Sequence, residues 1–120
     1  MSFPAAFAEG LRHFNRGAYF EAHEAFEECL DEVEADERWD LLVALIQVAV
    51  GYHKLASGNV GAARMLLLGA EKLAVFPDVA CGVVVGPLRR RAESDAAALE
   101  AGRATAASLR DDPPMLLLAA

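Results

Sequence analysis

Residues 14–28 read FNRGAYFEAHEAFEE, and this stretch decides the fold because it predicts the end of one helix and the start of the next. Gly17 suits the left-handed backbone that commonly caps the C-terminus of a helix. Apolar side chains recur at helical spacing before it, over residues 3–14, and again after it, over residues 18–34. The two segments therefore predict an antiparallel helical hairpin.

A second hairpin is predicted by the next two apolar segments. Asp36 can cap a helix over residues 37–57, whose middle is apolar almost all the way round, as is typical of a buried central helix. Gly58 ends that helix, and a fourth helix follows over residues 60–75. Gly17 and Gly58 lie 41 residues apart, and each is followed five residues later by alanine. The two hairpins therefore resemble tetratricopeptide units.

The rest of the chain is less regular. The valine-rich residues 78–86 favour extended backbone, but no partner strand is evident, so we predict a loop. Residues 87–109 predict a peripheral C-terminal helix in which Arg89, Arg90 and Arg91 form a solvated run. The predicted fold class is thus all-α, a compact bundle of two antiparallel, tetratricopeptide-like hairpins plus this peripheral helix.

A single helical domain is expected over residues 1–110, followed by an apolar tail over residues 111–120. The tail ends in MLLLAA, although chain termini are usually polar. We expect it to tuck into a groove or to join a neighbouring subunit, the alternative being a frayed end.

The net charge of −7 is concentrated near the N-terminus, where residues 1–40 hold 11 acidic and 3 basic side chains. Such a surface disfavours nucleic acid and anionic membranes, and it favours cations or a basic protein. No uninterrupted apolar run is longer than that of residues 41–46, which is too short to cross a bilayer. No secretory signal is evident and there are two cysteines, so we expect a cytoplasmic protein.

Three polar side chains of the second predicted helix have metal-ligand chemistry. His23 and Glu27 are four residues apart and therefore lie on one side of the helix, with Glu24 nearby. His53 on the central helix can supply a further ligand. A divalent metal such as zinc, manganese or iron would then be held by His23, Glu27 and His53, and Glu24 would act as the general base of a hydrolase.

The same residues also admit a structural interpretation. His23, Glu27 and His53 can satisfy one another's hydrogen bonds, with Gln47 as a fourth member, where the two hairpins meet. A histidine at the edge of an apolar face is more often packed and hydrogen-bonded than bound to a metal. The residues alone therefore favour the structural cluster.

The motifs in residues 14–27, 45–49 and 53–62 occur in a specific order and spacing. They resemble domain of unknown function family 309 (DUF309), a family of small all-helical proteins commonly labelled as predicted metal-dependent hydrolases. The resemblance covers about residues 5–75. It implies functional importance for the matching polar positions, which are Glu21, His23, Glu24, Glu27, Gln47, His53 and Asn59. Of these, Glu21, Gln47 and Asn59 would surround the ligands or support the fold.

From the residues and the resemblance together, we expect a small helical protein of unknown function that acts as a binding or structural module. The alternative is a metal-dependent hydrolase that uses the His-Glu-x-x-Glu helix and a second histidine. The cofactor is unknown, with a divalent metal as the candidate. The expected partner is a second copy of the chain or another protein.

Overall fold

The computed structural model describes residues 3–33 and 36–120 of the chain. Its helices, in chain order, are α1 (Ala5–Asn15), α2 (Tyr19–Glu28), the short 3-10 helix η1 (Leu30–Glu32), α3 (Glu37–Ala56), α4 (Ala62–Leu73), α5 (Gly86–Glu100) and α6 (Ala106–Asp111). Three short strands are β1 (Val79–Ala80), β2 (Val83–Val84) and β3 (Leu117–Leu118). The chain is mostly helical, as predicted, but its small antiparallel sheet means that it is not strictly all-α.

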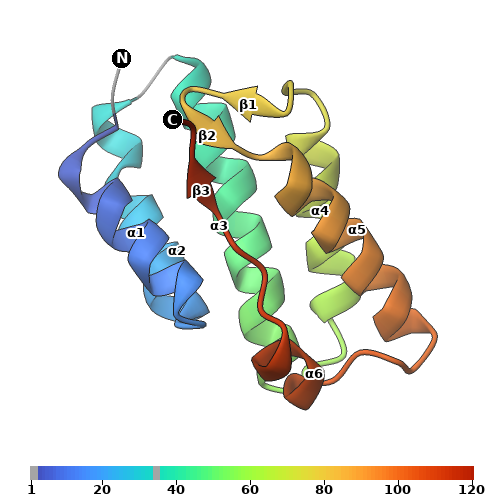
Figure 1. Ribbon diagram of the computed structural model, residues 1–120. Helices are drawn as coiled ribbons and strands as arrows, with labels where there is room; N and C mark the ends of the chain where they lie inside the picture. The colour runs from blue at the N-terminus through green and yellow to red at the C-terminus, as the bar shows by residue number, and fades with distance from the viewer. Residues whose placement is uncertain (1–2, 34–35) are drawn as a thin grey trace.

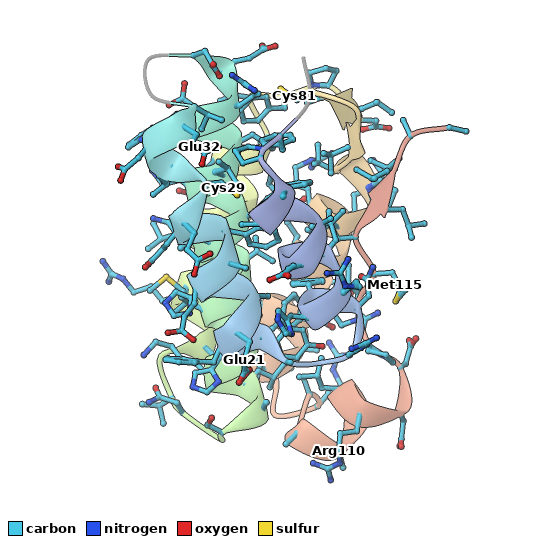
Figure 2. All side chains as sticks on the ribbon, turned by 90° about the vertical axis from the view of Figure 1, so that its left-hand side faces the viewer. Glu21, Cys29, Glu32, Cys81, Arg110 and Met115 are labelled. Atoms are coloured by element: carbon cyan, nitrogen blue, oxygen red, sulfur yellow. The ribbon has the colours of Figure 1, made fainter. Side chains whose placement is uncertain are left out.

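The two predicted helical hairpins form the body of the molecule. Helix α1 packs against α2, and α3 packs against both α2 and α4. Gly17 and Gly58 adopt φ angles of 81° and 70° at the ends of α1 and α3. This confirms Gly17 as a left-handed cap and Gly58 as the residue that ends the central helix. Figures 1 and 2 together show that α2, α3 and α4 form one layer, against which α1, β3 and α5 lie.

Helix α3 is the central helix, as predicted. The sides of α3 that face its neighbours are fully buried, and they include Tyr52 and Leu45. One stripe of α3, with members three or four residues apart, is only half-buried or exposed; it consists of Val43, Ile46, Gln47, Val50, His53 and Lys54. This stripe lies on the side of the layer that α1 and α5 do not cover, and we call that side the outer face.

Two glycines allow α3 and α4 to approach closely. A Cβ atom added at Gly51 would lie 2.7 Å from Leu66 Cδ2, and one added at Gly69 would lie 3.0 Å from the backbone nitrogen of Val48. A larger residue at either position would push the two helices apart, because packed interiors tolerate added volume poorly. The close contact therefore fixes how α3 and α4 sit beside each other in the layer.

The prediction of a loop over residues 78–86 is wrong, because β1 and β2 form a β-hairpin within this segment. Val79 pairs with Val84, and Ala80 pairs with Val83, in antiparallel register. The partner strand that the sequence did not reveal is β3, which comes from the C-terminal tail and pairs with β2.

The apolar tail folds back on its own chain, which is one of the alternatives expected from its composition. Leu116 is 1% exposed and belongs to the hydrophobic core. The side chain of Asn15 holds it in place: Asn15 Nδ2 donates to the Leu116 carbonyl at 2.9 Å, and Asn15 Oδ1 accepts from the Leu116 N–H at 2.8 Å. The tail is therefore anchored to the first helical hairpin.

Three predicted helix boundaries need correction. Helix α2 ends at Glu28 and continues as η1, and Glu34 lies outside the described residues. The helix predicted over residues 87–109 is two helices, because Gly102 adopts a φ of 72° and Thr105 starts α6 with a capping box. Val60, predicted as the first residue of the fourth helix, precedes α4 and is fully exposed.

Candidate functional site

His23 and His53 are brought near each other, and the ring of Phe20 contacts both. The centroid of the Phe20 ring lies 4.9 Å from that of His23 and 5.4 Å from that of His53. Phe20 remains 46% exposed, which is unusual for a phenylalanine in a chain of this size. The predicted meeting of α2 and α3 at these histidines is therefore an aromatic cluster that is open to solvent.

The predicted ligands His23 and Glu27 form a pair. His23 Nε2 lies 3.5 Å from Glu27 Oε1, and the side chains are 16% and 53% exposed. The other ring nitrogen, Nδ1, donates to the Phe20 carbonyl at 2.6 Å, as that acceptor requires. One nitrogen of His23 is thus bound to its own helix, and the other faces Glu27.

The remaining predicted residues are dispersed. Glu21 and Glu24 are exposed on α2, and neither forms an ion pair in the described part of the chain. Asn59 is exposed and its side chain accepts a hydrogen bond from the Gly61 N–H at 2.8 Å, which shapes the turn between α3 and α4. Gln47 Oε1 is buried without a hydrogen-bond partner among the described residues. The predicted network joining Gln47 to the two histidines is therefore not formed.

These residues do not fit a metal centre. Within residues 3–33 and 36–120, no group of three or more His, Cys, Asp or Glu side chains is placed to hold an ion. A protein metal site normally needs at least three such donors. The pair formed by His23 and Glu27 supplies two, and Phe20 lies against His53. We derive no metal chemistry from this arrangement.

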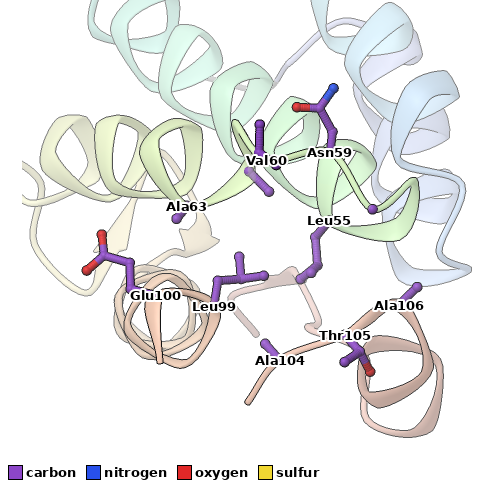
Figure 3. Close-up of a pocket in the computed structure, with 11 residues that line it drawn as sticks. Leu55, Asn59, Val60, Ala63, Leu99, Glu100, Ala104, Thr105 and Ala106 are labelled. Carbon is purple, nitrogen blue, oxygen red and sulfur yellow. The ribbon is translucent and has the colours of Figure 1, made fainter. Parts of the chain in front are cut away.

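A hollow beside the turn between α3 and α4 also lacks catalytic groups. It has a volume of about 510 Å³ and lies between the α3–α4 turn and the α5–α6 loop, where Leu55 and Leu99 point toward each other (Figure 3). Glu100 is the one titratable side chain among the residues that line it. A pocket with no nucleophile–base pair offers no hydrolytic machinery.

Sequence reasoning missed a partly buried polar cluster formed by Tyr52, Asp95 and Arg91. Tyr52 Oη donates to Asp95 Oδ2 at 2.6 Å, and Arg91 Nε donates to the same oxygen at 2.8 Å. Arg91 also donates to the Asp112 carbonyl, so it is not part of a solvated run as predicted. The four-residue spacing of Arg91 and Asp95 was the one available signal, since Tyr52 is 43 residues away. The cluster ties α3 to α5 and the tail.

The outer face carries a pattern of apolar and charged side chains that the packing of the core does not require. Its middle is the half-buried apolar part of the α3 stripe, and rows of α2 and α4 side chains flank it at helical spacing. The α2 row is Phe20, Glu24 and Glu27, and the α4 row is Arg64, Leu68 and Lys72. The orientation follows from contacts, because Phe20 touches His53, and Lys72 shares a hollow with Val43.

The two edges of the outer face differ in charge. Residues 19–32 contain six acidic side chains and no lysine or arginine. On the opposite edge, Arg64 and Lys72 form no ion pair within the described residues. The face is therefore acidic along its α2 row and mainly apolar along α3, where Lys54 is also charged. Its α4 edge carries the basic side chains of Arg64 and Lys72 together with the exposed carboxylate of Glu71.

Comparison with known proteins gives one family. The model of the family described as "Domain of unknown function (DUF309)" matches residues 7–66, which is half of the chain. No curated protein and no solved structure matches. Among the described residues, no helix is long and apolar enough to span a membrane.

Proposed function

This chain belongs to the DUF309 family, whose function is not defined, and from that premise we propose that it is a binding module that docks another protein on the outer face. The observation that carries the proposal is the apolar α3 stripe with the exposed Phe20 at its edge. Contiguous exposed apolar surface on a small protein usually marks an interaction site.

The matched residues 7–66 divide into two groups, and the division supports this proposal. Phe14, Tyr19 and Tyr52 are buried and build the core, and Asn15 anchors the tail. Other matched residues point outward and contribute little to packing; they include Phe20, Glu24, Glu27 and His53. Side chains that do not stabilise the fold are the ones available to a partner.

We treat the two hairpins as tetratricopeptide-like units, which bind partners along one continuous surface of packed helices. We place the protein in the cytoplasm, in keeping with its two free cysteines, Cys29 and Cys81. The hydrolase alternative is not favoured by any donor set in the described structure.

Site-specific photo-crosslinking tests the proposal. Benzoylphenylalanine in place of Phe20 is expected to give a discrete cross-linked adduct on irradiation of expressing cells. The same group at Val60, which is fully exposed but away from the outer face, is the matched control and is expected to give none. Mass spectrometry of the purified adducts reads out the result.

A second substitution tests whether the cross-linked adduct reflects specific binding or random collision. Val50→Glu places a charge in the centre of the apolar stripe and is expected to reduce the Phe20 adduct at least about tenfold, as loss of a central interface contact does. Circular dichroism must show an unchanged fold. Equal adducts from positions 20 and 60, or an adduct that Val50→Glu leaves intact, would rule out the outer face as a docking surface.

A further inference from the structure

We infer that the partner on the outer face is a second copy of this chain, packed about a two-fold axis that runs parallel to α3. The inference rests on the proposed function, because it names the occupant of the same surface. Three observations carry it: the opposite charges of the two rows, the absence of ion pairs to Glu24, Arg64 and Lys72 among the described residues, and the dimensions of the molecule.

The charges on the two edges of the outer face favour a second copy as the partner, and they favour one orientation of the two-fold axis. When two copies meet face to face about an axis parallel to α3, the α2 row of one lies over the α4 row of the other. Glu24 and Glu27 then approach Arg64 and Lys72 on both sides of the interface. An axis across α3 would instead place α2 over α2, where like charges repel. A two-fold contact must match a surface to itself, and this face does so in one of the two orientations.

The unpartnered state of these side chains supports the same conclusion. Glu24, Arg64 and Lys72 form no ion pair in the described residues, and Glu27 faces the side chain of His23 alone. A different protein with a basic segment would use the acidic edge and leave the basic edge empty. A second copy uses both edges and the apolar stripe between them.

The face is large enough for a stable dimer. The molecule measures 40 × 25 × 25 Å and has a total accessible surface of 6315 Å². A specific interface takes roughly 800 Å² from each partner. The largest projection of the molecule is 40 by 25 Å, so such an interface would take up most of one side. Its centre is apolar, because Ile46, Val50 and Leu68 are half-buried there.

Charge reversal with complementation tests the inference. Sedimentation velocity on the full chain is expected to show a species of twice 12.8 kDa at concentrations up to about 100 µM, which detects micromolar dissociation constants. Glu24→Lys with Glu27→Lys is expected to give a monomer, and so is Arg64→Glu with Lys72→Glu. An equimolar mixture of the two double variants is expected to restore the dimer, because the reversed edges match again.

A control variant changes the net charge by the same amount at positions outside the outer face. Glu9→Lys with Glu100→Lys adds as much positive charge as the α2 variant but lies on α1 and α5, and it is expected to remain dimeric. A monomeric wild-type chain, a dimer that both reversals leave intact, or reversed monomers that fail to pair on mixing would overturn the inference. Each of these outcomes is separate from the appearance of a Phe20 adduct of any composition, on which the proposed function depends, and a Phe20 adduct that contains a different protein would overturn the inference and leave the proposed function intact.

Discussion

Replacing Leu116 with alanine is expected to lower the free energy of unfolding by about 2–5 kcal/mol, the cost of removing a fully buried leucine side chain. Leu116 is 1% exposed and sits four residues before the C-terminus. Its loss leaves a cavity beneath the tail and loosens the two hydrogen bonds that Asn15 makes to its backbone. Denaturation by urea, followed by circular dichroism, measures the change.

The neighbouring residue supplies the control for this prediction. Leu117 follows Leu116 directly and begins β3, but it is 54% exposed, so Leu117→Ala is expected to change stability by no more than about 0.5 kcal/mol. Equal effects at positions 116 and 117 would show that the tail is frayed in solution. A large effect confined to position 116 would show that the last residues belong to the core.

The helices could be predicted because their causes are local. Gly17 and Gly58 end α1 and α3 because glycine adopts positive φ angles freely, and the apolar segments on either side of each glycine predict the two hairpins. The apolar middle of α3 likewise predicts a buried, central helix. Each of these signals lies within one helix or one turn, so periodicity and capping preferences capture them.

The sheet could not be predicted because its partners lie far apart in the chain. Val83 pairs with Leu118, and Val84 pairs with Leu117, across more than 30 residues. Each strand is two residues long, which is too short for alternation to be recognised. The tail's apolar composition was the one available signal, and it indicated burial without indicating where.

The candidate site was predictable in part. The contact of His23 with Glu27 follows from their four-residue spacing, and the nearness of His53 follows from packing α2 against α3. The position of Phe20 against both histidines depends on how the two helices are rotated, which the sequence does not specify. Tyr52, Asp95 and Arg91 come together through the packing of α5, a helix outside the matched residues.

The two tyrosines are expected to stay protonated in the folded protein well above pH 10, where tyrosine in an unfolded chain ionises. Burial raises the pKa of Tyr19 to about 12, against a smaller lowering by Arg91. Burial and the hydrogen bond to Asp95 raise the pKa of Tyr52 beyond its usual range. Burial also raises the pKa of the Cys29 thiol to about 11.

These shifts make the fold sensitive to alkali. Below about pH 8 all three groups are protonated in both states, and their contribution to stability is complete. As pH rises further, the unfolded chain loses these protons first, so stability falls by about 1.4 kcal/mol for each unit by which a pKa is raised. Unfolding is therefore expected between about pH 9 and 12.

Absorbance at 295 nm reads this out directly, because Tyr19 and Tyr52 are the only tyrosines in the chain. Tyrosinate is expected to appear together with the loss of helical circular dichroism, and not near pH 10 in a folded protein. Tyr19→Phe is expected to halve the amplitude at little or no cost in stability, because Tyr19 Oη is buried without a hydrogen-bond partner in the described residues. Tyr52→Phe, which removes the bond to Asp95, is expected to cost about 1–3 kcal/mol. Half of the absorbance rising near pH 10 with the helices intact would show that one phenol is solvated. If that rise persists in Tyr19→Phe, the solvated phenol is Tyr52, and its cluster with Asp95 and Arg91 is open.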